Sequence, residues 1–412
     1  MKKVCLFTTF YEVDSGFSLV SVVETQLQML LDNGYDPLVL VEERFGKTDK
    51  ELWQVEQIDL RPIVPQPEKD YKEFLNMLRG LPPLDVIITH DLILHLQFYA
   101  KHDKALRQYA KENPHILWLH YIHSRPTANY EPPPGWIIYP NWTDKPQVTN
   151  CYKTDRVVTN RSSHSIDPLK IWPYDPLTVD LVKKSNLLAG DITAIYPRGG
   201  DSGKQTDKII RLMAGVKNAG YTPKLLIVDW QSQGGKFQNY MDKMEILAEE
   251  LGLSENVYFT SRLDDRCSQG IPRKNVIELL NLTNVYIHSS KAETYGLVPH
   301  EAMLQGNLVC LNWDWQVMAE LFGDNAIYFD FGSVTIDRTY KPDEQTFWND
   351  EARRLINEYK KNRALVAQTE ARQKWTPQAL WQDFEGLLHL ETFQDVLKPK
   401  EGKSFPLTDR VG

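Results

Sequence analysis

Cysteines and long hydrophobic runs are scarce in this sequence. The 412 residues include four cysteines, Cys5, Cys151, Cys267 and Cys310. They are too sparse for a disulfide scaffold and lack the paired spacing of a zinc site. No window approaches the roughly 18 apolar residues that a membrane span requires. We therefore expect a soluble protein of the cytoplasm, a reducing compartment, with no stable membrane insertion.

An excess of positive charge is also missing. Lys and Arg number 47 against 55 Asp and Glu, so the formal net charge is -8, and neither half of the chain has the basic character typical of nucleic-acid-binding proteins. The fractions of hydrophobic (42%) and charged (25%) residues are those of an ordinary globular protein. A chain of this length is about twice what one hydrophobic core usually supports, so we expect two domains of similar size.

The first part of the chain alternates between predicted strands and helices. Short apolar runs at residues 3–9 and 37–41 flank a stretch whose apolar residues, from Leu19 to Leu30, repeat at helical spacing. Further strands are predicted at residues 86–89, 116–120 and 156–159. Strand, helix and strand in this order form the unit of a parallel α/β sheet, so residues 1–180 are predicted to be a doubly wound Rossmann-like domain.

Two proline-rich stretches interrupt this pattern. The first cannot be the interior of a helix and is predicted to be an ordered surface excursion; it contains Pro132, Pro133, Pro134, Pro140 and Pro146. The second, at residues 172–176, resembles a linker between domains.

From residue 191 the alternation begins again. Strands are predicted at residues 192–196, 224–228, 256–259, 285–289 and 308–311. Residues 181–375 are therefore predicted to be a second Rossmann-like domain, followed by a terminal helix within 376–397 that packs back on the first domain and a flexible tail at 398–412. Open α/β sheets bind ligands beyond the carboxyl ends of their strands, so polar residues there are the candidate site residues.

The strand at 285–289 leads into a segment with two glutamates, Glu293 and Glu301, separated by seven residues. Gly296 lets the backbone approach a ligand where a helix begins, and the free N–H groups of Leu297 and Val298 can hold a phosphate there. Glu293 can reach a sugar hydroxyl, and Glu301 can accept the hydroxyls of a ribose. The alternative is a capped amphipathic helix with two solvated glutamates.

This segment resembles the E-x7-E signature of retaining glycosyltransferases of family 4, which have the GT-B fold. The matching elements are two serines, Glu293, the pair Tyr295-Gly296, Glu301-Ala302-Met303 and Gly306 ahead of the next strand. The resemblance implies an α/β protein of two Rossmann-like domains facing a central cleft, a nucleoside-diphosphate sugar as donor and no cofactor. It also implies a catalytic role for Glu293 and donor-binding roles for Thr294, Tyr295, Gly296, Leu297, Val298 and Glu301.

The loop after the strand at 192–196 resembles the Gly-Arg-x(n)-Lys-Gly loop of the same family. In the family these two cations clamp the donor diphosphate, and the resemblance assigns this role to Arg198 and Lys204. Fixed cations stabilise the negative charge that grows on a leaving diphosphate. No Asp-x-Asp metal-ligand set is recognisable, and the doublet Asp264-Asp265 is expected at the surface, so we expect no metal.

The same loop departs from the family pattern at two positions. Pro197 stands where the family often has Gly before the Arg, and Gln205 stands where it often has Gly after the Lys. These departures bear on the geometry of the loop more than on its charge. The alternative is a solvated Arg and Lys in a glycine turn.

Candidates in the first domain rest on position. Ser15 and Gly16 lie in the loop after the first strand, where the family has a paired-glycine loop near the diphosphate or acceptor. His90 and His120 lie at the carboxyl ends of predicted strands, and the family's histidine beside the donor sugar corresponds best to His120, with His123 as the second choice. The alternative for each histidine is a side chain satisfied by backbone groups at a strand end.

The residues after the strand at 256–259 complete the predicted donor site. The resemblance places the nucleobase against the main chain of Arg262 and Leu263. It does not identify the base.

Together these motifs predict an enzyme that moves a sugar from a nucleoside-diphosphate sugar to an acceptor hydroxyl with retention of configuration. One alternative is a non-catalytic GT-B sugar-nucleotide-binding protein, but the intact set of Glu293, Glu301, Arg198 and Lys204 argues against it, because such a protein has no need of charges poised for a leaving diphosphate. Another is a GT-B epimerase or phosphorylase. Epimerases lack the E-x7-E loop, and the cofactor lysine that a phosphorylase needs is not recognisable.

The acceptor is expected to be a saccharide or a small molecule. The helix predicted at residues 18–31 has no Lys or Arg, which disfavours docking on a membrane. The alternative acceptor is a hydroxymethylated DNA base, held by a basic and aromatic lip. That lip would consist of Arg125, Lys145, Lys153, Arg156, Arg161 and Lys170 with Trp136, Trp142 and Tyr152.

Overall fold

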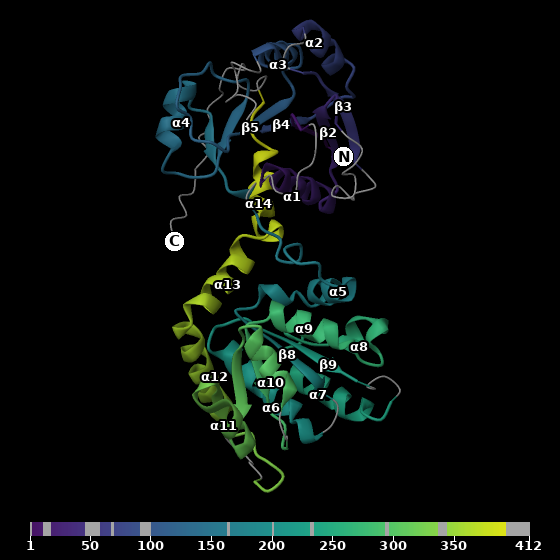
Figure 1. Ribbon diagram of the computed structural model, residues 1–412, viewed down its shortest axis with the longest axis vertical. Helices are drawn as coiled ribbons and strands as arrows, with labels where there is room; N and C mark the ends of the chain where they lie inside the picture. Colours follow the sequence, from purple (N-terminus) through teal and green to yellow (C-terminus); the bar gives the residue numbers. More distant parts are fainter. Residues whose placement is uncertain are drawn as a thin grey trace. The chain divides into compact units, whose positions relative to one another are not determined.

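The computed structural model divides the chain into two units. It describes residues 2–10, 18–45, 58–66, 70–90, 100–162, 165–199, 202–230, 235–292, 296–336 and 344–392. The first unit consists of Met1–Asp167 and Trp375–Gly412, and the second of Pro168–Lys374 (Figure 1). The boundary predicted after residue 180 falls inside α5 (Pro176–Ser185), which belongs wholly to the second unit.

The first unit is built on a seven-stranded parallel sheet with the order β3-β2-β1-β4-β5-β6-β7. Its strands are β1 (Lys3–Phe7), β2 (Asp36–Glu42), β3 (Asp59–Val64), β4 (Val86–His90), β5 (Leu117–Tyr121), β6 (Trp136–Tyr139) and β7 (Val157–Thr159). The order runs outward from β1 in both directions, which is the mark of a doubly wound sheet.

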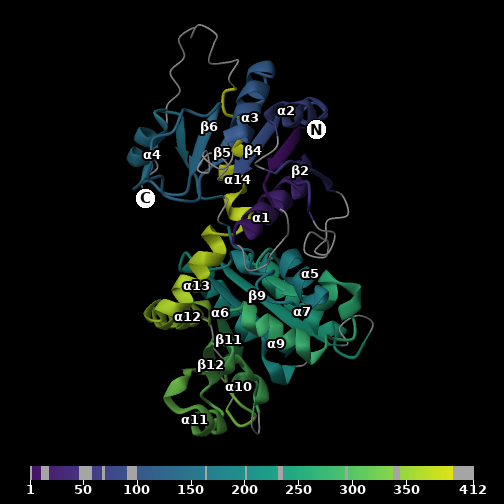
Figure 2. The same cartoon turned by 45° about the horizontal axis from the view of Figure 1, so that its top comes forward.

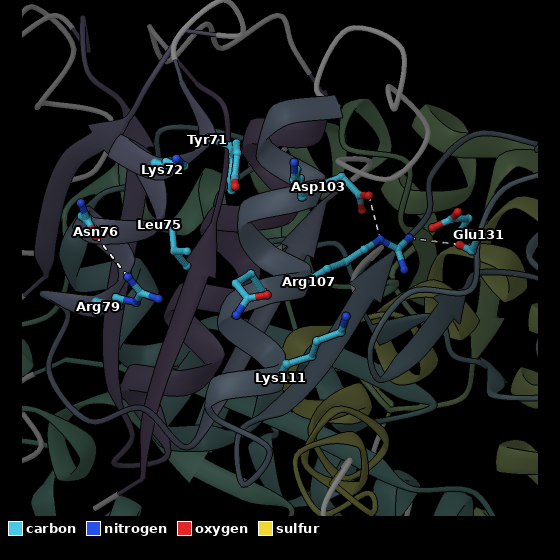
Figure 3. A pocket seen from close by; sticks show the side chains of 11 residues that line it. Tyr71, Lys72, Leu75, Asn76, Arg79, Asp103, Arg107, Lys111 and Glu131 are labelled. Atoms are coloured by element: carbon cyan, nitrogen blue, oxygen red, sulfur yellow. Dashed lines mark hydrogen bonds and ion pairs between the residues drawn. The ribbon is translucent and has the colours of Figure 1, made fainter.

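Helices cover both faces of this sheet. They are α1 (Ser18–Asp32), α2 (Tyr71–Arg79), α3 (Ala100–Glu112), α4 (Lys145–Tyr152) and α14 (Pro377–Leu387). Side chains alternate between the faces of a strand, so Val4 and Leu6 of β1 join the core under α1 and α14, while Cys5 and Phe7 join the core under α2 and α3. Helices α2 and α3 lie side by side (Figure 2), and a pocket of about 640 Å³ opens between them (Figure 3).

The proline-rich stretch contains a strand, so its prediction as a surface excursion was wrong for residues 136–139. β6 pairs with β5 and β7, and Ile137 and Ile138 are fully buried. Gly135 enters the strand with φ +99°, and a Cβ there would lie 2.4 Å from the Trp118 carbonyl oxygen. Pro146 lies in the first turn of α4, where its missing N–H is not needed.

Helix α14 packs on the sheet of the first unit. Phe384 and Leu387 are buried in the same core as residues of α1. The Lys2 ammonium donates to the carbonyl of Leu388 at 3.2 Å, which ties the first residues of the chain to the end of this helix.

The second unit is built on a six-stranded parallel sheet with the order β10-β9-β8-β11-β12-β13. Its strands are β8 (Ile192–Gly199), β9 (Pro223–Asp229), β10 (Val257–Phe259), β11 (Val285–His288), β12 (Leu308–Asn312) and β13 (Ile327–Phe329). The described helices include α6 (Thr206–Asn218), α7 (Gln238–Glu250), α8 (Thr260–Leu263), α9 (Arg273–Leu282), α10 (Leu297–Leu304), α11 (Gln316–Phe322), α12 (Glu344–Lys361) and α13 (Arg363–Lys374). The predicted fold class, α/β with two Rossmann-like doubly wound domains, is confirmed.

Candidate functional site

A pocket of about 500 Å³ lies at the carboxyl edge of the second sheet. It is formed where β8 and β9 end and where α9 and α10 begin, which is the position at which open α/β sheets bind ligands. The residues that line it include Pro197, Asp229, Trp230, Gly270, Arg273, Leu297, Val298 and Glu301. Leu297, Val298 and Glu301 were predicted as donor-binding residues, whereas Trp230 and Arg273 were not.

The beginning of α10 faces this pocket. Gly296 precedes the helix with φ +77°, a left-handed conformation that glycine adopts without strain. The first N–H groups of a helix have no acceptor within it, so those of Leu297 and Val298 are open to a ligand. A nitrogen of the His300 ring bonds to the Gly296 carbonyl at 2.8 Å, which fixes the turn ahead of the helix.

Glu301 is directed into the pocket and paired. Its side chain is 13% exposed, and its Oε1 accepts a hydrogen bond from Nη2 of Arg273, the first residue of α9. The ion pair draws one carboxylate oxygen toward Arg273, and Oε2 has no partner among the described residues.

The two predicted motif loops meet in the structure. Lys204 Nζ donates to Ser290 Oγ at 3.2 Å, and the Lys291 N–H donates to the Gly203 carbonyl at 2.9 Å. The hydroxyl of Ser289 donates to the Lys204 carbonyl at 2.6 Å. The loop after β8 is therefore bonded to the carboxyl end of β11, directly ahead of the E-x7-E segment. The side chain of Arg198 lies outside the described residues, as do Glu293, Thr294 and Tyr295.

Gln205 occupies a left-handed position in the loop after β8, where the pattern discussed above often has Gly. Its φ of +51° is in the left-handed region, which glycine adopts more easily than other residues. Its side chain is buried, and Nε2 donates to the carbonyls of Ser289 at 2.7 Å and Gly332 at 3.1 Å. These bonds to the end of β11 and to the segment after β13 offset the strain of the backbone.

Asp229 and Trp230 follow β9 directly. Asp229 is fully buried, and its Oδ1 accepts from the Thr260 hydroxyl at 2.9 Å and from the Ser261 N–H at 2.9 Å, so it holds the first turn of α8. Trp230 is 39% exposed, and its ring lies 3.1 Å from where a Cβ on Gly270 would stand. The rule that sites follow the carboxyl ends of strands could have found both residues.

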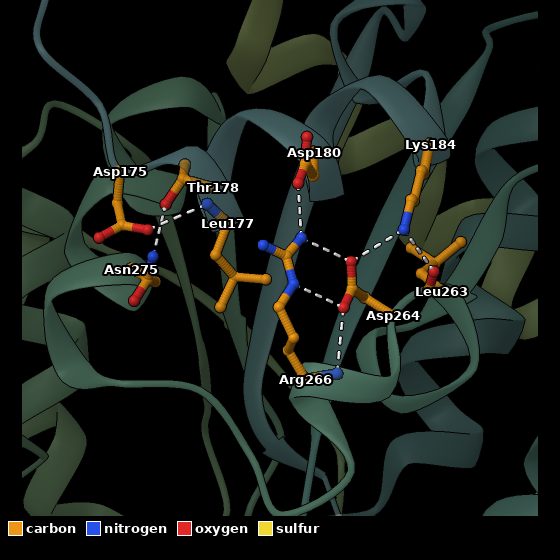
Figure 4. Close-up of polar contacts among 9 residues, drawn as sticks. All are labelled: Asp175, Leu177, Thr178, Asp180, Lys184, Leu263, Asp264, Arg266 and Asn275. Atoms are coloured by element: carbon orange, nitrogen blue, oxygen red, sulfur yellow. Dashed lines mark hydrogen bonds and ion pairs between the residues drawn. The ribbon is translucent and has the colours of Figure 1, made fainter.

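Arg262 and Leu263, predicted to hold the nucleobase, do not line the pocket. Arg262 Nη2 pairs with Asp242 at 2.5 Å and its Nε lies 3.6 Å from Glu245, both on α7. The Leu263 carbonyl accepts from Lys184 Nζ at 3.1 Å (Figure 4).

The prediction that the doublet Asp264-Asp265 lies at the surface was wrong for Asp264. Its carboxylate is buried and accepts from Arg266 Nε at 2.8 Å and from Lys184 Nζ at 2.8 Å (Figure 4). The Arg266 guanidinium, together with the Lys184 ammonium, holds the pKa of Asp264 well below its usual range. Asp264 therefore joins α5 to α8 as a structural carboxylate.

In the first unit, His120 is buried in β5 with both ring nitrogens occupied. Nε2 bonds to the Pro134 carbonyl at 2.6 Å, so Nε2 carries the proton, and Nδ1 accepts from the Thr89 hydroxyl at 2.8 Å. Burial lowers the pKa of His120 to about 4. The ring is thus neutral near pH 7, and neither nitrogen is available to a sugar in this arrangement.

His90 and His123 form a separate pair. His90 Nδ1 lies 2.9 Å from His123 Nε2, and His90 Nε2 lies 3.0 Å from Gln26 Oε1. The two rings stack with their centres 5.2 Å apart. His123 is partly exposed whereas His90 is buried, so His123 has the better access to a ligand. Ser15 and Gly16 lie outside the described residues.

Not every residue of the basic and aromatic lip predicted in the first domain lies at the surface. Tyr152 is fully buried, and Trp136 donates to the Glu391 carbonyl at 2.9 Å. Arg125 pairs with Asp144 at 3.3 Å, which neutralises part of the predicted charge. Lys170 belongs to the second unit.

Neither a metal-ion cluster nor a membrane-spanning helix is found in the described part of the chain. Within the described part of the chain, no cluster of three or more His, Cys, Asp or Glu side chains is arranged to hold a metal ion. No described helix combines the length and the apolar character needed to cross a bilayer.

Residues 180–363 match the family model of the glycosyl transferases group 1. The matched range contains the pocket, Lys204 and Glu301, so the candidate site lies in the part of the chain that is similar to this family. A comparison with curated proteins finds no match.

Solved structures resemble the chain over most of its length at low sequence identity. A glycosyltransferase from Rickettsia africae ESF-5 is 13% identical, covers 97% of this chain and 99% of its own, and has a TM-score of 0.34. Sucrose-phosphate synthase from Thermosynechococcus elongatus is 15% identical, with 94% and 98% covered and a TM-score of 0.35. The catalytic domain of starch synthase IV from Arabidopsis thaliana is 11% identical, with 94% and 98% covered and a TM-score of 0.31.

Proposed function

We propose that the protein transfers a sugar from a nucleoside-diphosphate sugar to an acceptor hydroxyl with retention of configuration. The observation that carries the proposal is the pocket at the carboxyl edge of the second sheet, into which Glu301 and the beginning of α10 project. Its volume of about 500 Å³ is in the range of small-molecule sites, which is about 300–1,000 Å³.

Each part of a nucleotide has a partner of suitable chemistry in this pocket. Oε2 of Glu301 can accept a ribose hydroxyl while Oε1 stays on Arg273. The N–H groups of Leu297 and Val298 can donate to phosphate oxygens, assisted by the dipole of α10. The partly exposed ring of Trp230 can stack on a nucleobase, which makes it a better candidate for this role than Arg262 or Leu263.

Sugar transfer requires stabilisation of the leaving diphosphate. Negative charge grows on that group as the glycosidic bond breaks, so a fixed cation favours the transition state over the ground state. Lys204 is tied to the end of β11 through Ser290, which holds its ammonium group beside the E-x7-E segment. Together with Arg198 it would take the place of a metal ion, and Glu293 would orient the transferred sugar.

We propose a saccharide or small molecule as the acceptor, with His123 as the first-domain histidine that would contact a substrate. This replaces His120, whose ring nitrogens are both engaged within the core.

Trp230→Ala is expected to weaken binding of the nucleoside diphosphate by about 1–3 kcal/mol, the usual worth of stacking between a base and an aromatic ring. The measurement is isothermal titration with each of the common nucleoside diphosphates. Trp313→Ala is the matched control, since Trp313 is an exposed tryptophan of the same unit outside the pocket. Equal affinity for wild type and Trp230→Ala would remove Trp230 from the site.

EDTA is expected to leave the transfer rate nearly unchanged. If Lys204 and Arg198 supply the positive charge, then no divalent ion has to be bound. The measurement is the initial rate of transfer before and after dialysis against the chelator, with readdition of Mg²⁺ or Mn²⁺. A loss of activity that either metal restores would contradict this part of the proposal.

A further inference from the structure

The pocket between α2 and α3 takes no part in the candidate site, because none of the predicted site residues lines it (Figure 3). Its walls come from these two helices and from Glu131. The helices carry six Lys and Arg against three Asp and Glu, whereas the whole chain has a net charge of -8. A positive surface of this kind on an acidic protein favours an anionic ligand.

The two arginines of the pocket are held in place by acidic neighbours. Arg79 Nη2 pairs with Glu112 at 2.5 Å, and Arg107 Nε pairs with Asp103 at 2.7 Å. Arg107 also donates to the Pro132 carbonyl at 2.5 Å. These pairs fix the arginines and neutralise much of their charge, so they shape the walls of the pocket.

Three lysines supply the positive charge that is not neutralised. Lys72, Lys104 and Lys111 have exposed side chains and no ion pair within the described part of the chain. Lys104 Nζ lies 4.1 Å from the ring centre of Tyr71. Lys104 and Lys111 are about two turns apart on α3, or about 10 Å, a length over which one strand of B-form DNA carries about three phosphates.

We propose that this pocket binds the sugar-phosphate backbone of a nucleic acid. The lysines match a row of phosphates rather than one, and the amides of Asn76 and Gln108 can donate to phosphate or sugar oxygens. A membrane surface fits less well, because the large hydrophobic side chains exposed in the described residues include none from α2 or α3. The proposal goes beyond the proposed function and is independent of it, since binding needs no donor.

The test is fluorescence anisotropy of labelled 20-nucleotide single strands and duplexes with the full-length protein at two or more salt concentrations. The variant is Lys72→Glu with Lys111→Glu. The matched control is Lys183→Glu with Lys243→Glu, which makes the same change in net charge at exposed lysines of α5 and α7. The first pair is expected to lower affinity by about tenfold or more and to flatten the salt slope by about 0.7 per lost single-strand contact. The control pair is expected to stay within about twofold of wild type.

Several outcomes would overturn the proposal. One is no binding of oligonucleotide by wild type at about 50 mM salt, and another is an equal loss of oligonucleotide affinity in both pairs of substitutions. A third is full competition by inorganic phosphate at the oligonucleotide's own concentration. The last is binding to anionic vesicles but not to oligonucleotides. Thermal shift measures the binding of a nucleoside diphosphate. Both double variants are expected to bind it as wild type does. Absence of this binding from wild type would contradict the proposed function and leave this proposal standing.

Discussion

Lys204→Ala is expected to lower kcat/KM for sugar transfer by about 30- to 900-fold, the equivalent of about 2–4 kcal/mol of transition-state stabilisation. In the proposed function the ammonium group interacts most strongly with the diphosphate as it leaves. Most of the loss should therefore be in kcat, while KM for the donor changes less. Lys204→Arg, which keeps the charge, should recover part of the activity.

The substitution should leave the fold intact, which makes the kinetic result interpretable. The carbonyl of Lys204 accepts from the hydroxyls of Tyr196 at 2.7 Å and Ser289 at 2.6 Å, and these backbone bonds survive the change. The side chain contributes one hydrogen bond, to Ser290, worth about 1 kcal/mol. Thermal denaturation should show a small shift, as it should for the control Lys243→Ala on the exposed side of α7. Near-wild-type turnover in Lys204→Ala would remove this lysine from the mechanism.

The sequence revealed those strands whose apolar residues run without interruption. β4, β8 and β11 are buried on both sides and were predicted within one or two residues, apart from the last residues of β8. β3 was missed because it alternates charged and apolar residues and contains Pro62. β6 was missed because prolines surround it, and only pairing with β5 and β7 makes it a strand.

Residues of the candidate site were predictable where one local segment holds them. Gly296 and Glu301 share a segment with a fixed spacing, and the structure places Glu301 in the pocket. Arg273 comes from another helix, and its pairing with Glu301 depends on how α9 and α10 pack. No spacing in the sequence carries that information.

The histidines show the same limit. Position alone made His120 and His123 similar, since both follow closely on the end of a predicted strand. What separates them is the Pro134 carbonyl, which accepts a hydrogen bond from the ring of His120 and lies just ahead of the neighbouring strand β6. A hydrogen bond of this kind depends on the tertiary fold, because only the pairing of β5 with β6 brings the two residues together.

Glu293→Ala is expected to abolish most turnover while leaving donor affinity largely unchanged. In the proposed function the first glutamate of the E-x7-E segment contacts the transferred sugar and the second contacts the ribose. Substitutions of the two glutamates should therefore change different kinetic constants. Loss of an interaction made in the transition state lowers kcat, whereas loss of a ribose contact raises KM for the donor. The measurement is a full kinetic analysis of transfer with donor affinity determined by titration.

Glu301→Gln is the matched variant for this experiment, because it changes the other glutamate of the same segment. It should raise KM for the donor by about 10- to 150-fold, the equivalent of about 1.5–3 kcal/mol for a hydrogen bond to a charged group, with a smaller effect on kcat. It also weakens the pair with Arg273, so Arg273→Ala is needed to separate that contribution. Two backbone positions near Glu293 are fixed in the structure. The N–H of Lys291 donates to the carbonyl of Gly203, and Gly296 stands at the start of α10. If Glu293→Ala transferred sugar at a rate near that of wild type, or if both glutamates affected KM alone, the division of roles within the segment would be wrong.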